Sequence, residues 1–409
     1  MNTSQNTPVS LASLNSNDVV IASVARTAIG SFQGALSSIP APRLGATAIQ
    51  AALARAGLKP EQVDEVILGN VLSAGIGQAP ARQAMIAAGI PNTTGATTVN
   101  KVCGSGMKAV MMAAQSIALG DSQVVVAGGM ENMSQAPYLL PTARNGFRMG
   151  HQTAVDSMIH DGLWDPYNNQ HMGNCAELCA KEKHFSREAQ DAFAIESFKR
   201  AQIAQKEGKF KAEIAPVSIA GKKGDAVVFD TDEGPSKANF EKMPSLRPAF
   251  DKNGSVTAAN ASTINDGAAA LVLMSAAKAK ELGVKPLARV KAYGANAGAP
   301  EWFTTAPAEA MRRAMKKAGW TPKDVDLWEV NEAFAVVAMA AQTELEIPAD
   351  RLNVWGGGIS LGHPIGASGA RIVITLVSAL QATGGVRGVA GICIGGGEAT
   401  ALCVERIEG

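Results

Sequence analysis

The sequence predicts an α/β fold that is made of two duplicated halves with a loop-rich domain inserted between them. Three observations support this prediction. β-branched segments typical of buried strands alternate with Ala-rich segments typical of helices, part of the first half recurs in the second, and the stretch between the copies is richer in charge. Alternating buried strands and helices favour mainly parallel sheets that are covered on both faces.

The duplication is visible in two pairs of segments. Ala56-Gly-Leu-Lys-Pro-Glu-Gln-Val-Asp64 aligns without a gap with Ala318-Gly-Trp-Thr-Pro-Lys-Asp-Val-Asp326. At nearly the same offset further on, Cys103-Gly-Ser-Gly-Met-Lys108 aligns with Gly366-Ala-Ser-Gly-Ala-Arg371. Two halves of this kind place corresponding loops near a shared pseudo-twofold axis. We therefore expect loops from both halves to line one cleft.

These copies divide the chain into four predicted segments. Residues 1–17 are rich in Asn, Ser and Thr and are expected to form a flexible tail. Residues 18–133 form the N-terminal half, and residues 263–409 form the C-terminal half, with the strand region 258–264 at the boundary. Residues 134–262 mix helical patches with looser charged segments, so we expect them to form a lid and a ligand-binding surface over the cleft.

Local patterns predict the individual elements in chain order. β-branched and apolar runs predict strands over residues 18–24, 65–68, 95–99 and 124–127, the last of which leads into two glycines. A loop is expected over residues 26–30. Ala-rich or amphipathic runs predict helices over residues 46–56, 80–88, 107–119, 175–183 and 187–205.

Composition limits the classes of function. The chain has 409 residues and a formal net charge of +1, so nothing favours a nucleic-acid or anionic-membrane partner. No run approaches 18 apolar residues, and we therefore expect no membrane span. Residues 1–17 contain no Lys or Arg, which speaks against a secretory signal or a transit peptide. Five scattered cysteines are most simply reduced thiols, so we expect a cytoplasmic protein.

Cys103 stands at a strand-to-helix corner. The extended segment 95–99 precedes it and the helical segment 107–119 follows it, while Gly104 and Gly106 allow a tight turn. A thiol at a helix N-terminus is exposed to free N–H groups and to the positive end of the helix dipole, which favour the thiolate. This placement suits a nucleophile, although for an isolated cysteine a small buried side chain is the simpler interpretation.

Three further glycine-rich loops carry groups that complete a reaction site. Asn331 begins the segment Asn-Glu-Ala-Phe, and His363 is the only histidine of the second half and lies among glycines before a proline. Cys393 stands at the end of a predicted strand, before three glycines. Together, one thiolate attacks, a histidine exchanges protons, a second thiolate abstracts a proton, and glycine N–H groups hold oxyanions.

From Asp18 to the C-terminus, the sequence closely resembles the thiolase family. Six motifs in order carry the resemblance, and jointly they are highly specific. They are Val99-Asn-Lys-Val-Cys-Gly-Ser-Gly106, Gly128-Gly-Met-Glu-Asn-Met-Ser134, His171-Met-Gly173, Asn331-Glu-Ala-Phe334, Gly362-His-Pro-Ile-Gly-Ala-Ser-Gly369 and Cys393-Ile-Gly-Gly-Gly397.

The resemblance implies a role for each group in the loops. Cys103 is the acyl-accepting nucleophile, His363 activates it, and Cys393 is the second acid and base. Asn331 holds a water that stabilises the enolate oxygen together with the histidine. The N–H groups of Cys103 and Gly395 form the other oxyanion hole. The family also implies a five-layered αβαβα fold and an inserted loop domain that binds coenzyme A (CoA).

The resemblance further implies the reaction and the assembly. The expected activity is acetyl-CoA C-acetyltransferase, a reversible Claisen condensation of two acetyl-CoA to acetoacetyl-CoA and CoA through an acetyl-cysteine. Acyl-CoA thioesters are substrates, and the thiol-bound intermediate explains why no metal or redox cofactor is expected. The family implies a homo-oligomer, and we expect a homotetramer built as a dimer of dimers.

The segment His171-Met172 resembles the short-chain, biosynthetic branch of the family, in which this pair contacts CoA and narrows the acyl pocket. Taken singly, each residue assigned to substrate binding is explained equally well by ordinary packing. The residues at positions where that branch contacts pantetheine or acyl groups are Leu163, His171, Met172, Phe250, Ala258, Ser262, Ala333 and Phe334.

Two positions depart from the family pattern. Potassium-dependent relatives carry a tyrosine where this chain has Phe193, so the missing hydroxyl speaks against potassium activation. A small or apolar residue is expected after the triple glycine, where this chain has Glu398. From the sequence, Glu398 is either solvated or buried against a partner.

Some of the motifs also allow interpretations as other kinds of site. Gly358-Ile-Ser-Leu-Gly362 matches a hydrolase nucleophile elbow, but no aspartate follows and His363 is too near. His171, Cys175 and Cys179 share one helical face, as zinc ligands do, but lack a fourth ligand nearby. Among functions, the alternatives are a broader 3-ketoacyl-CoA thiolase, a decarboxylating condensing enzyme and a catalytically silent CoA- or lipid-binding relative.

Overall fold

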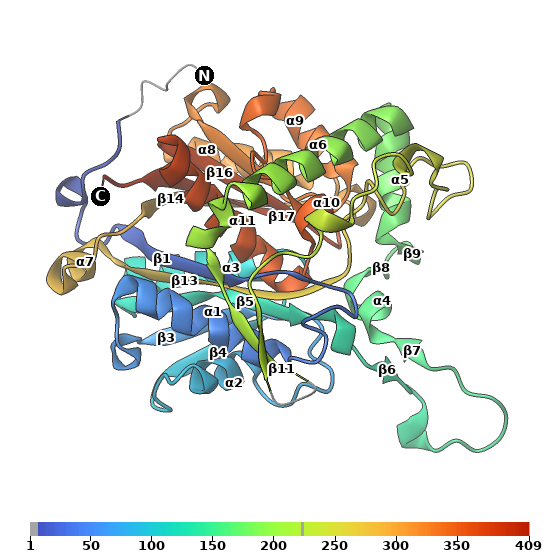
Figure 1. The fold of residues 1–409 in the computed structure, drawn as a ribbon, viewed down its shortest axis with the longest axis horizontal. Helices are drawn as coiled ribbons and strands as arrows, with labels where there is room; N and C mark the ends of the chain where they lie inside the picture. The colour runs from blue at the N-terminus through green and yellow to red at the C-terminus, as the bar shows by residue number, and fades with distance from the viewer. Residues whose placement is uncertain (1–6, 222–224, 409) are drawn as a thin grey trace.

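The computed structural model describes residues 7–221 and 225–408 and shows a layered α/β architecture (Figure 1). Its main sheet has the strand order β15-β16-β17-β14-β1-β13-β5-β3-β4. In chain order these strands are β1 Val19–Thr27, β3 Glu65–Gly69, β4 Gly95–Val99, β5 Val124–Asn132, β13 Asn265–Ser275, β14 Ala288–Ala297, β15 Leu327–Val330, β16 Arg387–Ile394 and β17 Glu398–Arg406. The short strands β2 (Gly30–Ser31) and β10 (Ile214–Ala215) pair with β13 and β1.

The main sheet is mixed, so the prediction of mainly parallel pairing is wrong. The pairs β3/β4, β3/β5 and β15/β16 are parallel. The pairs β1/β13, β5/β13, β14/β17 and β16/β17 are antiparallel, as is the short contact between β1 and β14 that joins the two halves. Strands β16 and β17 follow each other through a tight turn, and such a connection permits only antiparallel pairing.

Strand β13 lies between β1 and β5, within the N-terminal part of the sheet. The predicted boundary at residue 263 is therefore wrong, because β13 and α7 (Ala276–Leu282) complete the first half, and the second half begins with β14. The sequence copies that define the duplication do not extend over β13, and its apolar run is typical of a buried strand in either half.

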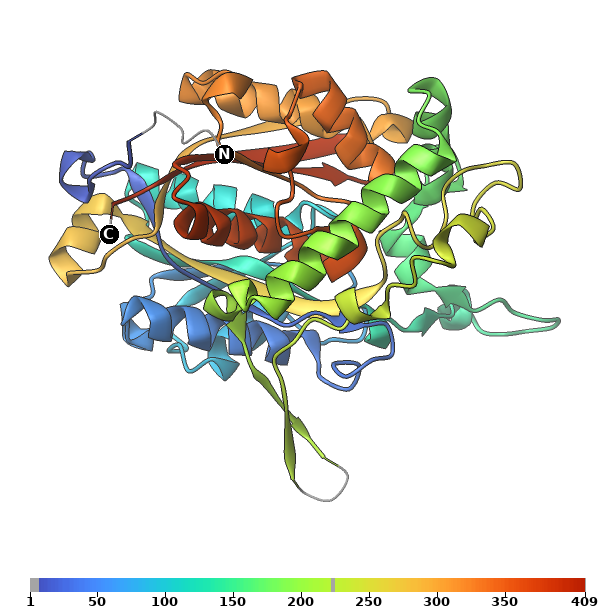
Figure 2. The ribbon, with the colours of Figure 1, turned by 45° about the horizontal axis from the view of Figure 1, so that its top comes forward.

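Helices cover the sheet in three layers, which with the two halves of the sheet give five layers, as predicted. The outer helices on the N-terminal side are α1 (Ala41–Ala56) and α2 (Pro80–Ala87), and those on the C-terminal side are α8 (Ala306–Ala318) and α9 (Ala335–Leu345). The middle layer consists of α3 (Ser105–Leu119) and α11 (Ile365–Thr383), which Figure 2 shows between the two parts of the sheet. Separate apolar cores fill these interfaces.

The middle-layer helices are apolar because protein surrounds them. No membrane span is expected from the sequence, but residues 102–119 and 365–383 form helices that are long and apolar enough to cross a membrane by length and composition. Of the second segment, 89% is buried within the fold. Of the first segment, 56% is buried, so α3 keeps some exposed positions, whereas α11 is enclosed over most of its length and its hydrophobicity follows from that position.

The N-terminal segment is packed from residue 9 onward. The Val9 N–H donates to the Arg406 carbonyl at 3.1 Å, and the Glu408 N–H donates to the Val9 carbonyl at 2.9 Å. Leu14 is buried in the core beside α1. A flexible tail is therefore the wrong description of residues 9–17, whose apolar positions the Asn/Ser/Thr-rich composition obscured, and residues 1–6 lie outside the described residues.

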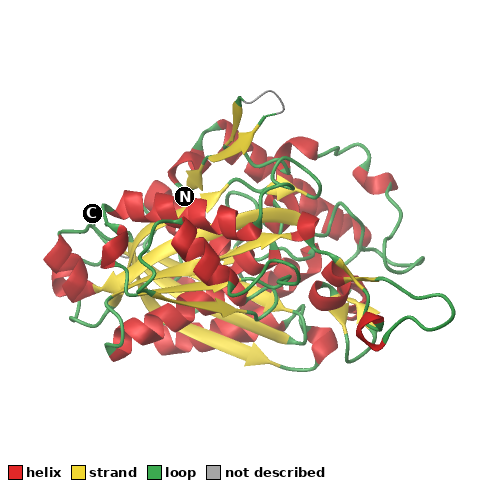
Figure 3. Ribbon diagram, turned by 90° about the horizontal axis from the view of Figure 1, so that it is seen from below, coloured by secondary structure: helices red, strands yellow, loops and turns green. Residues whose placement is uncertain are grey.

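The inserted region carries irregular segments and short elements over one end of the layers. A loop between β6 and β7 and the hairpin β11–β12 project from the body (Figures 1 and 3). The elements are β6 Tyr138–Leu139, β7 Val155–Asp156, α4 Ser157–Gly162, β8 Trp164–Asp165, β9 Gln170–His171, α5 Met172–Glu182, α6 Arg187–Lys206, β11 Val217–Ala220 and β12 Ala226–Phe229, and α10 Gly358–Leu361 lies against α6.

Candidate active site

Cys103 lies in a tight turn between β4 and α3 that its own neighbours hold in place. Val102 has a φ of 44°, a left-handed conformation that is strained for a β-branched residue. The Ser105 hydroxyl donates to the Val102 carbonyl at 2.6 Å and accepts from the Lys101 N–H at 2.8 Å, while the Val102 N–H donates to the Asn100 side chain at 3.0 Å. Such strain persists only where surrounding contacts enforce it, as these do.

The Cys103 thiol is neutral in the resting protein. Burial raises its pKa to about 11, and the negative charge of Glu131 acts in the same direction. The N–H groups of Gly395 and of Cys103 itself lower the pKa, but less than burial raises it. The expectation that the position of Cys103 favours the thiolate is therefore wrong, because the cost of burying the charge exceeds what these N–H groups contribute. Cys103 needs a base that accepts its proton as it attacks.

His363 is buried and neutral, as such a base must be. Its Nδ1 lies 2.6 Å from the Ser368 hydroxyl, which donates to the Pro364 carbonyl at 2.9 Å. Because the Ser368 hydroxyl proton is donated to Pro364, His363 Nδ1 must be the donor in the contact with Ser368, and His363 Nε2 keeps its lone pair. Burial lowers the His363 pKa to about 3, and the positive charge of Arg371 contributes. The imidazole thus accepts a proton only transiently.

Asn331 follows β15 and lies beside the imidazole. Its Nδ2 lies 3.5 Å from His363 Nε2, and its backbone N–H donates to the Gly391 carbonyl at 3.0 Å. Among the described residues, no hydrogen-bond donor reaches its buried Oδ1. The side chain therefore offers an acceptor next to the base, which suits the binding of a water or a substrate.

Cys393 ends strand β16, and the turn that follows faces the nucleophile. Gly396 and Gly397 have φ angles of 92° and 86°, so the triple glycine serves a hairpin turn that other residues adopt only with strain. Gly395 precedes this pair, and its N–H points to Cys103. Burial raises the Cys393 pKa well above its usual value, and a charge on Cys103 raises it further.

The loops that carry Cys103, His363 and Cys393 lie next to one another. Any side chain at Gly104 would overlap Ile394, the neighbour of Cys393. Cys103 also packs in the same small apolar cluster as Leu163 and as Ile365, which lies two residues after His363. The two thiols and the imidazole therefore share one site, to which the N-terminal half contributes the first thiol and the C-terminal half the rest.

The residues assigned to substrate binding form an aromatic wall beside the thiols. Met172 is buried, and a Cβ built on Gly395 would lie 3.3 Å from its sulfur. His171 caps α5 by accepting the Gly173 N–H at Nδ1 (3.0 Å). Its ring stacks on Phe250 with the centroids 4.8 Å apart, and Phe250 meets the Phe334 ring edge-on at 6.1 Å.

The remaining predicted contact residues lie on two segments that are joined by backbone hydrogen bonds. The Ser262 N–H donates to the Ala333 carbonyl at 2.9 Å, and the Ala335 N–H donates to the Asn260 carbonyl at 2.8 Å. Ala333 is buried. Ala258, by contrast, is exposed, so it lies on an accessible surface.

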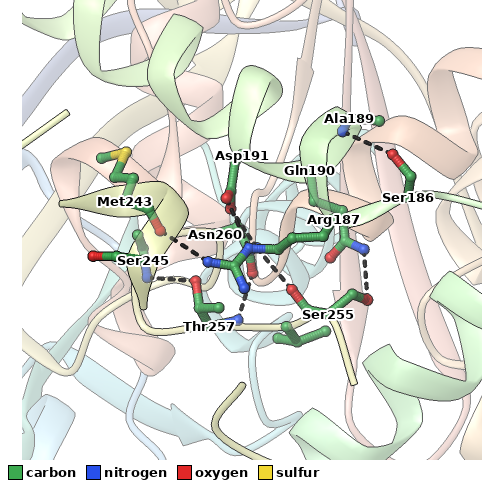
Figure 4. Close-up of polar contacts among 12 residues, drawn as sticks. Ser186, Arg187, Ala189, Gln190, Asp191, Met243, Ser245, Ser255, Thr257 and Asn260 are labelled. Carbon is green, nitrogen blue, oxygen red and sulfur yellow. Dashed lines mark hydrogen bonds and ion pairs between the residues drawn. The ribbon is translucent and has the colours of Figure 1, made fainter. Parts of the chain in front are cut away.

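A polar network from the inserted region holds the segment that bears Ala258 (Figure 4). Arg187 donates to the Asp191 carboxylate at 2.7 Å and to the Met243 carbonyl at 2.8 Å. Asp191 in turn accepts from Asn260 Nδ2 at 2.9 Å. Helix α6 therefore fixes the wall of the site, and nothing in the local sequence marks these residues for that role.

The alternative interpretations of the motifs fail on geometry. The Ser360 hydroxyl is buried and lies 2.8 Å from the Ser197 hydroxyl, so it is no exposed nucleophile. His171 uses Nδ1 as a helix cap, and no group of three or more metal-ligating side chains occurs in residues 7–221 and 225–408. Glu398 belongs to the second half and forms an ion pair with Lys101 of the first half. This ion pair accounts for a charged residue after the triple glycine.

Phe193 packs in an apolar cluster that also contains Ala259 and Ile359.

Two residues of the site were not predicted from the sequence. Ser368 orients His363 and lies inside a quoted motif, five residues after the histidine. Arg371 acts on the histidine through its charge alone, and no local pattern indicates that.

Comparisons with known proteins agree with this geometry. The family model described as "Thiolase, N-terminal domain" matches residues 19–277, and "Thiolase, C-terminal domain" matches residues 284–406. An acetyl-CoA acetyltransferase of Cupriavidus necator is 58% identical over 391 residues, which cover 95% of this chain and 99% of the relative. Acetyl-CoA acetyltransferase 2 of Arabidopsis thaliana is 56% identical over 397 residues, covering 97% and 98%.

A solved structure shares the fold. The crystal structure of the Acat5 thiolase from Ascaris suum in complex with coenzyme A superposes with a TM-score of 0.91 at 46% identity. The match covers 95% of this chain and all of that one.

Replacing Ser368 by Ala should slow turnover by about 10-fold, because His363 loses the acceptor that fixes its tautomer, a hydrogen bond worth about 1.4 kcal/mol. Steady-state rates of acetoacetyl-CoA cleavage measure the effect. Ser378→Ala on the same helix is the matched control and should retain the wild-type rate. Equal rates for both variants would contradict the role assigned to Ser368.

The low pKa of His363 should appear in the stability of the protein toward acid. Between about pH 6.5 and pH 3, the unfolded chain binds a proton at this residue that the folded chain does not. As the pH is lowered through this range, the free energy of unfolding should therefore decrease by about 1.4 kcal/mol for each pH unit because of this group alone. Urea unfolding of His363→Gln between pH 4.5 and 6 should show a shallower dependence than wild type, and parallel curves would show that the imidazole is not buried neutral.

Proposed function

The chain belongs to the thiolase family, and from this we propose that it is an acetyl-CoA C-acetyltransferase. It condenses two acetyl-CoA to acetoacetyl-CoA and CoA, and it also catalyses the reverse cleavage. The convergence of Cys103, His363 and Cys393 in one site beside the aromatic wall carries the proposal. The acetyl-CoA acetyltransferases that match nearly the whole chain at 58% and 56% identity support it.

The first half-reaction transfers acetyl to Cys103. As the sulfur attacks the thioester carbonyl, His363 Nε2 accepts the thiol proton, for which its low pKa makes it a transient carrier. The N–H groups of Cys103 and Gly395 hold the oxyanion, and an oxyanion-hole donor is worth about 3 kcal/mol in comparable sites. The imidazolium then returns the proton to the departing CoA sulfur.

The second half-reaction forms the carbon–carbon bond. Cys393 is a neutral thiol at rest, so its proton first passes to His363 Nε2. The thiolate that forms takes a proton from the methyl group of a second acetyl-CoA, and its raised pKa makes it a strong base for this weakly acidic C–H bond. The protonated His363 Nε2 and Asn331 Nδ2 lie together and can both donate to the enolate oxygen. The enolate carbon attacks the acetyl-cysteine, Cys103 leaves as a thiolate that takes the proton from His363, and acetoacetyl-CoA is released.

This chemistry uses acyl-CoA thioesters as its only co-reactants. The acetyl group is carried on sulfur, no change of oxidation state occurs, and proton transfer is assigned to named side chains. We therefore propose that the reaction needs no resident metal or redox cofactor. Phe193 lies in an apolar cluster, which supports independence from potassium.

The assembly and compartment are also proposals. We propose a homotetramer, built as a dimer of dimers. Strand β4 is an edge strand with half-exposed residues, which favours pairing with a second copy. The β6–β7 loop exposes Phe147 by 50% and Met149 by 92%, which favours a second apolar contact. Five free thiols favour the reducing cytoplasm.

Substituting each cysteine should separate the two half-reactions. Cys103→Ala should lose acetyl labelling from radiolabelled acetyl-CoA, because no other group accepts the acetyl. Cys393→Ala should still be labelled and yet condense at least about 1,000-fold more slowly. Cys403→Ala, another buried cysteine of the same sheet, is the control and should retain both activities. Normal acetoacetyl-CoA synthesis by Cys393→Ala would overturn its role.

Chain-length preference separates this function from a broader 3-ketoacyl-CoA thiolase. Met172, Phe250 and Phe334 narrow the space beside the thiols, so acetoacetyl-CoA should be cleaved at least about 10-fold more efficiently than a medium-chain 3-ketoacyl-CoA, at about 1–3 kcal/mol per misfitting methylene. Comparison of kcat/KM for the two substrates provides the test. Equal values would favour the broader enzyme, and no turnover of either would favour a silent CoA-binding relative.

A further inference from the structure

Glu131 is a buried carboxylate that the reaction described above does not use. It lies near the end of β5, within the motif Gly128–Ser134, and has no exposed surface. Its carboxylate accepts four hydrogen bonds, from Asn70 Nδ2 at 2.8 Å, Val71 N–H at 3.0 Å, Leu72 N–H at 3.1 Å and Gly366 N–H at 2.9 Å. A buried carboxylate that accepts this many hydrogen bonds links the segments that carry the donors.

The hydrogen bonds require the charged form of Glu131. Each carboxylate oxygen accepts two of the four bonds, so a proton on either oxygen would face an N–H donor. Burial raises the pKa of Glu131 to about 7 and nearby Asp266 raises it as well, while the N–H groups of Val71, Leu72 and Gly366 lower it. Because all four partners are donors, we take the ionised form as the native one.

The four donors come from both halves of the molecule. Asn70, Val71 and Leu72 directly follow β3 of the first half. Gly366 belongs to the first turn of α11 in the second half, three residues after His363. Helix α11 begins after Pro364, which provides no side-chain cap, so its free N–H groups need an outside acceptor. Glu131 provides that acceptor and places a negative charge at the positive end of the helix.

The same turn is packed too closely to move without cost. A side chain at Gly366 would meet the Glu131 carboxylate at 2.5 Å. A side chain at Gly69 would come within 2.6 Å of the Gly366 carbonyl oxygen, and one at Gly106, on the first turn of α3, within 3.0 Å. The start of α11 is therefore seated against the segments that precede and follow the nucleophile loop.

We propose that Glu131 is a positioning residue that fixes the start of α11, and with it His363 and Ser368, against the Cys103 loop of the other half. The inference rests on the proposed function and adds a residue to it. Glu131 touches neither the substrate nor the reacting atoms, and it acts through the backbone of Gly366.

Its charge has a second, independent effect on the nucleophile. The negative charge of Glu131 raises the pKa of Cys103. Neutralising the carboxylate should therefore make the thiol ionise more easily, while the displaced imidazole makes turnover slower. Simple structural damage gives no reason for these two changes to run in opposite directions.

The experiment compares Glu131→Gln with wild type in the full-length enzyme. Glutamine keeps the shape but turns an NH2 group toward two N–H donors. We expect kcat for acetoacetyl-CoA cleavage to fall by about 10- to 100-fold, as for a small misplacement of a reacting group, with KM within twofold. Alkylation of Cys103 by iodoacetamide, followed from pH 7 to 10, should be faster than in wild type at each pH, because below the pKa a lower pKa gives a larger fraction of thiolate.

Glu177→Gln is the matched control. Its carboxylate also accepts backbone N–H groups, those of Ser255 and Val256, but in the wall of the substrate site. This variant should raise KM, largely retain kcat and leave the alkylation profile unchanged. The same pattern in Glu131→Gln would overturn the proposal, because it would indicate loss of substrate binding rather than of alignment.

A further variant keeps the test decisive if Glu131→Gln does not fold. Asn70→Ala removes one donor and retains the charge, so kcat should fall several-fold with an unchanged alkylation profile. An unchanged kcat in either folded variant would overturn the role of Glu131. A wild-type enzyme that forms no acetoacetyl-CoA would instead overturn the proposed function, so the two failures are distinguishable.

Discussion

The close packing of α11 against the first half of the molecule is the constraint on which the site depends. The Gly366 carbonyl oxygen lies within 3.0 Å of the positions that Cβ atoms on Gly69, Gly106 and Gly129 would take, so side chains at these positions would keep the two halves from approaching this far. This approach brings the loop of His363 and the loop of Cys103 together. Apolar burial across the middle layer, where α11 has no solvent-facing side, stabilises the contact.

Burial also decides the electrostatics of the site. Each reacting group is held in its neutral form, since desolvation raises the pKa of both thiols and lowers that of the imidazole. The N–H groups of Gly395 and of Cys103 itself oppose the shift at the nucleophile without reversing it. Charge therefore appears at the site only during the reaction, where preorganised donors are most effective.

Much of the fold and of the site could be predicted from the sequence, for identifiable reasons. The duplication and the glycine-rich loops are local patterns, and they are the basis on which Cys103, Asn331, His363 and Cys393 were predicted to share one site. The strand pairing was predicted wrongly because the direction of a buried apolar strand such as β13 depends on its partners, which its own residues do not specify. Ser368 lies only five residues after His363, but its contact with the imidazole depends on how the chain turns into α11. Glu131 acts on Gly366, which is distant in the sequence, and no local spacing reveals that contact.

The neutral resting state of Cys103 has a consequence for how the enzyme endures oxidative conditions. Peroxides and other electrophiles react with thiolates far faster than with thiols, so a cysteine whose pKa is about 11 is a poor target for them. The nucleophile becomes reactive only when a thioester lies beside it and His363 accepts its proton. The Cys103 sulfur therefore reacts slowly with oxidants at rest and can still act as a nucleophile, because it is activated only in the presence of its substrate.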